Sequence, residues 1–360
     1  KLTEFFRVQF PKDPDDSDFV YRQATRAKAF DALRGLLPAA SLSNVGIYGT
    51  GQAYEALLLR MRSHPLPEAR TYADLIRHEL RKVIPSFLKR VDLADRGVAW
   101  STYLATNRTA MDEVADRLFP ADTPADGAPV VTLTDFDPEA EVKLVTAMLY
   151  AHTHVPETQV EARVRAMSAQ DRLGVVAAYV GDRSNRRHRP GRALERIDYR
   201  FDVLADYGAF RDLQRHRMLT VEWQQLSPRH GFTRPESIDL AGETETFDAA
   251  MARSAALHDL LEPRFPAQAP YAVALAYKVR FVMQMNAREA MHVLELRSGP
   301  QGHPAYREVA QQMHRLVAEQ AGHHAVAEMM RYVDHAPEPS LERLEAERRA
   351  EARRSGGSTP

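Results

Sequence analysis

The feature that most constrains the fold of this chain is the segment from Met285 to Ser298. It is rich in Ala, Glu, Leu and Met, which favour helix, so it predicts a helix of about three turns. A helix holds polar side chains in a fixed arrangement better than a loop does. The segment therefore predicts a site for an anion, formed by its polar residues Asn286, Arg288, His292 and Arg297.

A second motif precedes this helix. Asp212-Leu213-Gln214 leads into the triplet Arg215-His216-Arg217, at the end of a predicted helix over residues 210–217. An Arg-His-Arg triplet followed by an Asn-Ala-Arg helix that ends in Leu-x-Leu-Arg is a rare pairing. On these residues the chain resembles the flavin-dependent thymidylate synthases.

The composition excludes several other classes of protein. The 360 residues contain no cysteine, so disulfides, thiolate metal sites and a sulfur nucleophile are ruled out. Uracil methylation that depends on a cysteine nucleophile is thereby excluded, whereas the flavin-dependent route needs none. A formal charge of −1 argues against a surface that coats nucleic acid.

The pattern along the chain predicts an α+β protein. Helices are expected over residues 16–34, from about residue 51, over 72–89 and over 139–150, with strands over 130–133 and 199–204. The Pro-, Asp- and Ala-rich stretch 118–129 predicts a linker. The resemblance implies a thymidylate synthase-like fold, with a mixed sheet packed against long helices.

The two halves of the chain contain similar segments. Residues 56–63 align with residues 291–298 at constant spacing, which places Arg62 opposite Arg297. We expect two tandem repeats, although two amphipathic helices followed by a Pro-containing loop also look alike by chance. The predicted division is an eroded, partial first repeat at 1–120, a more complete second repeat at 129–335, and a charged, disordered tail at 336–360. In this interpretation we expect the front half of the first repeat to lie upstream of Lys1.

The resemblance also implies roles for individual residues. Arg297 orients the uracil of the substrate and is the expected catalytic residue. A Ser-x-Arg motif that follows the triplet in the family corresponds here to Ser227 and Arg229. The expected substrate-binding residues are Arg215, Arg297, Ser227 and Arg229, and the expected flavin-binding residues are His216, Arg217, Asn286, Arg288 and His292.

The activity implied by the resemblance is reductive methylation of dUMP to dTMP. FAD is the cofactor, and NADPH and methylenetetrahydrofolate are co-substrates. Family members are homotetramers with active sites between subunits, so a fused pair predicts a homo-oligomer, as a dimer of duplicated chains. Without an apolar run long enough for a membrane or a signal peptide, we expect a cytoplasmic protein without a membrane partner.

Two departures from the family pattern leave other functions open. Ser227-Pro228-Arg229 comes two places late after the triplet, and Asp212 replaces a glutamine, where a carboxylate would repel a substrate phosphate. A flavoenzyme with a different acceptor, or a non-catalytic scaffold or binding protein, is therefore an alternative.

Other polar clusters are weaker candidates. The basic run 186–192 lacks interleaved aromatic residues, so nucleic acid is not an expected partner. His323, His324 and His335 have the character of surface histidines, and no metal is expected. Because the chain has no Gly-rich phosphate loop, flavin would be bound without a Rossmann motif.

Overall fold

The chain forms two compact units. The computed structural model describes residues 1–120, 123, 129–336, 341 and 343–356. Unit 1 comprises Lys1–Ala39, Ala128–His258 and Ala272–Pro360, and unit 2 comprises Ala40–Gly127 and Asp259–Tyr271. The change from unit 2 to unit 1 at Gly127 falls within the predicted linker. Residues 1–39 lie in unit 1, where Leu2, Phe6 and Ala29 join its hydrophobic core, and the predicted repeat boundaries stay a prediction.

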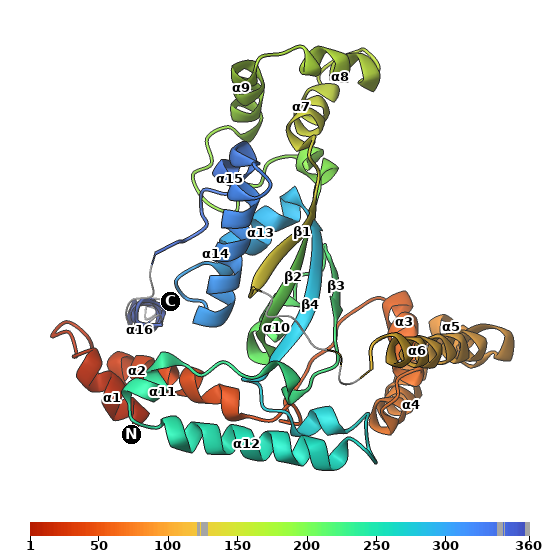
Figure 1. Cartoon of the computed structure of the whole chain (residues 1–360), viewed down its shortest axis with the longest axis vertical. Helices are drawn as coiled ribbons and strands as arrows, with labels where there is room; N and C mark the ends of the chain where they lie inside the picture. The colour runs from red at the N-terminus through yellow and green to blue at the C-terminus, as the bar shows by residue number, and fades with distance from the viewer. Residues whose placement is uncertain (121–122, 124–128, 337–340, 342, 357–360) are drawn as a thin grey trace. The chain divides into compact units, whose positions relative to one another are not determined.

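Unit 1 is built on a four-stranded sheet (Figure 1). The strands in spatial order are β1 (Val131–Phe136), β2 (Asp198–Asp206), β4 (Lys278–Asn286) and β3 (Thr220–Trp223). The predicted α+β class is confirmed. The mixed sheet is not found among these strands, since each adjacent pair runs antiparallel.

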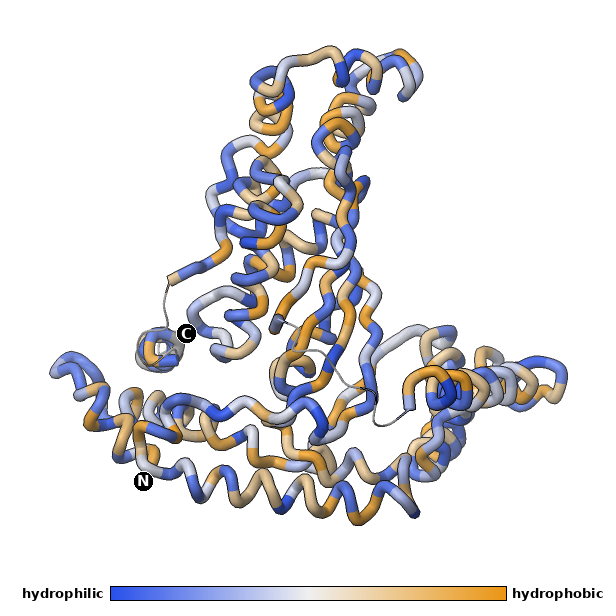
Figure 2. Tube along the Cα trace, in the orientation of Figure 1, coloured by the Kyte–Doolittle hydropathy of each residue, from blue (hydrophilic) through white to orange (hydrophobic). Residues whose placement is uncertain are grey.

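The two central strands form the core of unit 1. Buried residues alternate with partly exposed ones along β2 and β4, as expected for strands with one face packed against helices. The alternating hydropathy is visible along these strands in Figure 2. In Figure 1 the helices α13 (Ala287–Arg297) and α14 (Pro304–Glu319) lie beside the sheet, and α14 contacts both β1 and β2.

The remaining helices of unit 1 surround this core. They are α1 (Leu2–Gln9), α2 (Asp18–Leu33), η1 (Arg34–Leu36), α7 (Ala140–Tyr150), α8 (Glu157–Arg165), α9 (Ala169–Val180), η4 (Arg192–Arg196), α10 (Tyr207–Leu213), η5 (Pro228–His230), α11 (Glu236–Leu240) and α15 (His324–Met329). Helix α12 (Thr244–Leu261) and η6 (Ala269–Ala272) lie where the chain passes between the units.

Two predicted helices have different ends in the structure. The helix predicted over 210–217 is α10, which ends at Leu213, so the triplet lies in the turn that follows it. The helix predicted from Met285 begins at Ala287, because Met285 and Asn286 pair with β2 as the last residues of β4.

Unit 2 is helical within its described residues. It contains α3 (Gly51–Arg62), α4 (Pro67–Arg81), α5 (Pro85–Leu88), η2 (Lys89–Asp92), η3 (Ala94–Val98) and α6 (Ala99–Leu118). Its small core is formed by Leu58, Ala73, Leu88 and Val91. The helix predicted over 72–89, with an interruption at Pro85, corresponds to α4 and α5, because Pro85 cannot donate within a helix and instead begins α5.

The C-terminal segment contains a helix where a disordered tail was predicted. Helix α16 (Leu344–Gly356) packs along α2. Arg348 forms a bidentate ion pair with the buried Asp16, at 2.5 and 2.9 Å. Ser17 donates to Glu351 over 2.6 Å. These contacts supply the tertiary support that the charged sequence of α16 could not reveal.

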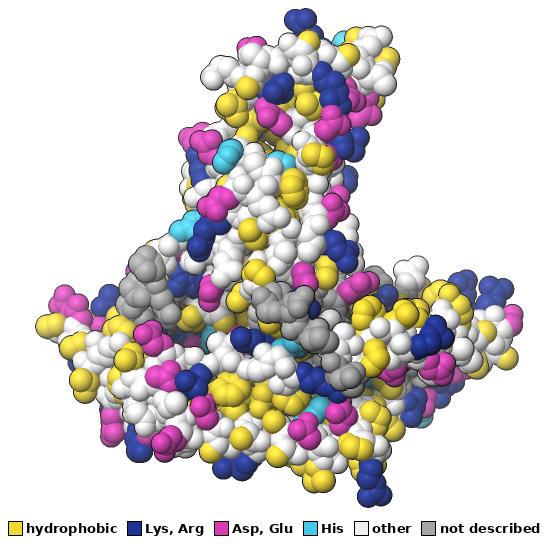
Figure 3. Space-filling model, in the orientation of Figure 1, with side chains coloured by type: hydrophobic (Ala, Val, Ile, Leu, Met, Phe, Trp, Pro, Cys, Tyr) yellow, Lys and Arg dark blue, Asp and Glu magenta, His cyan; other side chains and the backbone are white. Residues whose placement is uncertain are grey.

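The surface carries charges of both signs. On the face shown in Figure 3, Lys and Arg side chains are interspersed with Asp and Glu, in keeping with the formal net charge of −1. No helix in the described part of the chain is both long and apolar enough to cross a membrane.

Candidate functional site

The two sequence motifs meet where the turn after α10 lies against α13, although the two helices leave β2 and β4 at opposite ends of this antiparallel pair. Each helix begins with a side-chain cap: Asp206 accepts from the amide of Ala209 over 2.8 Å, and Asn286 accepts from the amide of Glu289 over 2.9 Å. Asn286, an expected flavin contact, therefore uses its amide oxygen to start α13. The turn after α10 reaches α13 through His216, which contacts both Arg297 and Glu289.

His216 joins the two motifs by hydrogen bonding. Its side chain is 3% exposed, and its Nε2 accepts from Nε of Arg297 over 2.9 Å. Its Nδ1 lies 3.4 Å from Oε1 of the buried Glu289. An accepting Nε2 carries no proton, so the proton of the imidazole is on Nδ1 and faces the carboxylate. Glu289 thereby selects the tautomer of His216 that can hold Arg297.

His216, Glu289 and His292 have the composition of a metal site. Their ligand atoms lie within 4.8 Å of one another. A metal on Nδ1 of His216 would require the proton to move to Nε2, which would break the hydrogen bond from Arg297. The hydrogen bond from Arg297 therefore indicates that His216 is a hydrogen-bonded residue rather than a metal ligand.

His292 and Arg288 lie beside the basic run 186–192. Arg189 contacts Nδ1 of His292 over 3.1 Å, and the rings of His292 and His216 are 5.4 Å apart. Burial, and then the charge of Arg189, lower the pKa of His292 below its ordinary value. Arg288 donates to the carbonyl of Pro190 over 3.1 Å and to Glu195 over 3.3 Å. This side of α13 thus carries several guanidinium groups.

Asp212 is the centre of an ion-pair network. Its carboxylate lies 3.4 Å from Arg215, 3.9 Å from Arg297 and 3.5 Å from Arg34. Asp212 was expected to repel a substrate phosphate. In the structure it is surrounded by arginines, and Arg215, a predicted nucleotide contact, is 70% exposed.

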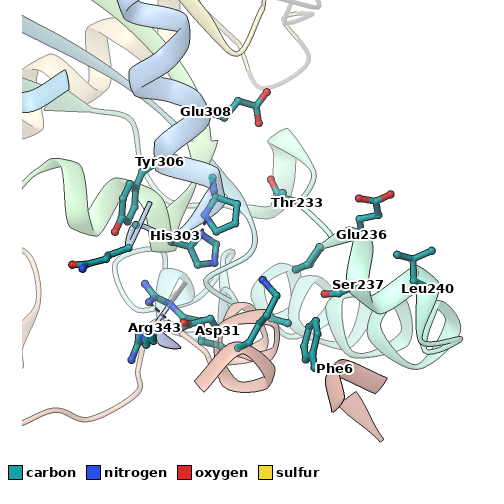
Figure 4. Close-up of a pocket in the computed structure, with 18 of the residues that line it drawn as sticks. Phe6, Asp31, Thr233, Glu236, Ser237, Leu240, His303, Tyr306, Glu308 and Arg343 are labelled. Carbon is teal, nitrogen blue, oxygen red and sulfur yellow. Dashed lines mark hydrogen bonds and ion pairs between the residues drawn. The ribbon is translucent and has the colours of Figure 1, made fainter. Parts of the chain in front are cut away.

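A pocket of about 350 Å³ lies next to this network (Figure 4). The guanidinium of Arg297 lies 5.4 Å from the ring centre of Tyr306, which lines the pocket. Figure 4 shows His303 and Tyr306 at the start of α14, with Asp31 and Arg343 below them and Phe6 on the far side. The residue expected to orient the substrate thus packs against the pocket wall.

Ser227 and Arg229 lie at η5, near the start of β4, where the amide of Lys278 donates to the carbonyl of Gly231. Helix α10 begins at the same end of β4, since the amides of Tyr207 and Gly208 donate to Tyr277 and Leu275. The structure brings Arg215 and Arg297 together through Asp212. Thr233, four residues after Arg229, lines the same pocket as Arg34.

Comparison with known proteins identifies the family. Residues 131–323 match the family model described as thymidylate synthase complementing protein. The chain belongs to the thymidylate synthase complementing protein family. The resemblance read from the two motifs is thereby confirmed at the level of the family.

Curated relatives in this family carry only general names. The chain is 34% identical over 353 residues to a UPF0159 protein of Chlamydia muridarum, covering 98% of this chain and 66% of the relative. It is 36% identical over 314 residues to a UPF0159 protein of Chlamydia pneumoniae, covering 86% and 58%. A UPF0159 protein of Thermoplasma acidophilum is 29% identical over 338 residues, covering 93% and 65%. The chain spans less than two thirds of the length of these relatives.

A solved structure is also similar to this chain. It is a flavin dependent thymidylate synthase ThyX from Helicobacter pylori complexed with FAD and dUMP, with 18% identity and a TM-score of 0.38. The similarity covers 52% of this chain and 93% of that chain.

Several residues near the family motifs were not predicted from the sequence to belong to the site. Glu289 and Arg189 could have been noticed, because Glu289 is three residues before His292 on one helix and Arg189 lies in the basic run. Arg34 and Arg343 carry no such signal. Both lie outside residues 131–323, so the thymidylate synthase complementing protein motifs do not point to them.

Proposed function

We propose that this protein is an FAD-dependent thymidylate synthase that reductively methylates dUMP to dTMP. The observation that carries the proposal is the hydrogen bond from Arg297 to His216, which joins the two family motifs across 81 residues. Methylenetetrahydrofolate supplies the one-carbon group and NADPH supplies the two reducing electrons, so that dTMP, tetrahydrofolate and NADP⁺ are the products.

The donors around α13 fit the pyrophosphate of FAD. Arg217 is exposed after the triplet, Arg288 is partly exposed, and Arg189 contacts His292. Guanidinium groups bind such oxygens through paired hydrogen bonds. His216 does not fit a direct flavin contact, because its side chain is buried and holds Arg297. When bound, the flavin supplies the hydride transfer chemistry.

The contribution of the protein is to position charge. The side chain of Arg297 is 14% exposed and is fixed by His216, Tyr306 and Asp212. A guanidinium held in this way stabilises negative charge that develops on the uracil carbonyls without reorganising during the reaction. We assign Arg297 as the catalytic residue and Arg215 as an additional nucleotide contact.

A flavoenzyme with a different acceptor is the second candidate. The late position of Ser227-Pro228-Arg229 after the triplet, and Asp212 where the family has a glutamine, favour it. The two candidates share the flavin site and differ only in the acceptor.

Because each chain contributes one intact motif pair, we also propose a homodimer as the working assembly.

The visible absorption spectrum of protein purified with added FAD tests the proposal. We expect flavin bands near ~370 and ~450 nm, weakened in Arg288→Ala and retained in the control Arg196→Ala. Arg196 is an exposed arginine outside this set, 3.9 Å from Glu157. The flavin-loaded protein is then assayed for dTMP formation from dUMP. Flavin binding without dTMP supports a different acceptor, and a colourless protein supports a scaffold.

A further inference from the structure

The pocket beside Arg297 is walled partly by segments that the family match does not include. Phe6, Asp31 and Arg34 come from the N-terminal region, and Arg343 precedes α16. Thr233, Ser237, His303 and Tyr306 supply the opposite wall from within residues 131–323. At about 350 Å³, the pocket falls in the range of small-molecule sites.

Two arginines lie together on the wall of this pocket. Asp31 lies 3.8 Å from Arg34 and 3.2 Å from Arg343, and all three side chains line the pocket. Arg34 also reaches Asp212 beside the pocket, which Arg215 and Arg297 share. Asp31 and Asp212 thus hold four guanidinium groups close together, and two of these groups, Arg34 and Arg343, face the pocket.

Three further charged residues line the pocket. Lys28 lies along the rings of Phe6 and Phe10 and adds a cation to one wall. Glu236 and Glu308 are exposed, and Glu308 accepts from Gln312 over 2.9 Å. Among the pocket-lining carboxylates, Asp31 is the one that pairs with both Arg34 and Arg343.

We propose that this pocket binds the phosphate of a nucleoside monophosphate acceptor, with Arg34 and Arg343 as phosphate ligands. They take the part that the Ser-x-Arg position, Ser227 and Arg229, was expected to play. Guanidinium groups match the geometry of phosphate oxygens, and the ring of the acceptor would lie toward Arg297 and Tyr306. The identity of the acceptor as dUMP rests on the proposed function, but the binding of a phosphate monoester does not.

Calorimetric titration of the full chain without flavin tests this assignment. We expect dUMP to bind at least about tenfold more tightly than deoxyuridine, the difference that one charge-assisted hydrogen bond provides. Arg34→Gln and Arg343→Gln should each weaken dUMP binding about tenfold and leave deoxyuridine binding unchanged. The control is Arg22→Gln, an exposed arginine on α2 that does not line the pocket.

The variant Arg229→Gln tests the alternative that the Ser-x-Arg position binds the phosphate. If Arg229→Gln removes the preference for dUMP over deoxyuridine while Arg34→Gln and Arg343→Gln bind as wild type, the assignment is overturned. Equal binding of dUMP and deoxyuridine, or no binding of either, overturns it as well. Arg34→Lys separates a phosphate role from a folding defect, since it keeps the charge and should retain part of the preference. Colourless protein that still prefers dUMP would refute the flavoenzyme and leave this inference standing.

Discussion

The Nε–H of Arg297 donates to Nε2 of His216 over 2.9 Å, and the opposite ring nitrogen of His216 faces Glu289. Through this hydrogen bond the histidine of the triplet holds the arginine that is expected to contact the uracil. Under the proposed function, we infer that His216 positions Arg297 for acceptor binding rather than contacting the flavin. It also makes the buried Glu289 part of the site.

Replacing His216 should therefore affect the acceptor more than the flavin. In His216→Ala the Arg297 side chain loses its anchor, and we expect dUMP affinity to fall about tenfold, the equivalent of one hydrogen bond to a charged group. The visible spectrum of bound flavin should change little. Calorimetry with dUMP and absorption of the purified protein measure the two effects separately. Loss of flavin with normal dUMP binding would restore the flavin-contact role.

Glu289 should act through the tautomer of His216. In Glu289→Ala nothing holds the proton on Nδ1, so Nε2 would be protonated in part of the molecules and could not accept from Arg297. We expect the dUMP affinity of this variant to resemble that of His216→Ala. Glu289→Gln keeps an acceptor oxygen and should retain most of the affinity. If both variants bind dUMP as wild type does, Glu289 has no positioning role.

Arg297→Lys should not behave as a conservative change. The arginine donates from Nε to His216 while its planar group lies over Tyr306, and a lysine ammonium cannot do both. We expect the turnover of dUMP by flavin-loaded protein to fall roughly 100-fold or more, as when one oriented donor is removed from a developing anion. Steady-state kinetics measure it, with folding checked by circular dichroism. A rate within twofold of wild type would argue against a catalytic Arg297.

The buried ion pair between Arg183 and Glu295 should dominate local stability. Both side chains are 2% exposed, and the guanidinium bonds the carboxylate twice at 2.8 Å. Glu295→Gln leaves a buried cation without its partner, which we expect to destabilise the protein by about 3–5 kcal/mol. Urea unfolding measures the change. The matched control is Glu161→Gln, in an exposed pair with Arg165, for which no measurable change is expected.

Local sequence patterns predicted much of the sheet and of α13, since alternation and helix-forming composition act over short ranges. The ends of α10 and α13 were missed because α10 stops at Leu213, before the triplet, and because Asn286 caps α13 while it pairs with β2 as the last residue of β4. The mixed sheet was wrong for a similar reason, because strand direction is set by tertiary contacts. The docking of Arg348 on Asp16, which supports the helix over 344–356, also depends on tertiary contacts.

The duplication stays a prediction. Helices α3 and α13 both begin after a capping side chain, Thr50 or Asn286, and both end at an arginine followed by serine. The two arginines have different surroundings. Arg62 is bound by Asp74 and Asp92 at 2.8 and 3.0 Å, so its charge is satisfied within unit 2, whereas Arg297 packs on the wall of the pocket.

The docking of α16 should depend on pH through Asp16. The hydrogen bonds from Arg348 hold the pKa of Asp16 below its ordinary value of 3.8. Because the pKa is lower when α16 is docked, the contribution of this pair is complete above pH 3.8 and is lost as the pH falls through the lowered pKa. Helix α16 should therefore stay docked from neutral pH down to about pH 4 and detach in stronger acid.

Asp16→Asn reproduces the protonated state at neutral pH and so separates this pair from general acid unfolding. We expect trypsin at pH 7 to cleave the variant faster than wild type after Arg348 and Arg349, because both follow the start of α16 and become accessible when it detaches. Asp15→Asn, an exposed neighbour, is the control and should be cleaved at the wild-type rate. Since Arg343 lies just before α16 and lines the pocket, Asp16→Asn should also weaken dUMP binding. Equal cleavage of all three proteins would mean that the Asp16–Arg348 pair does not hold α16 on α2.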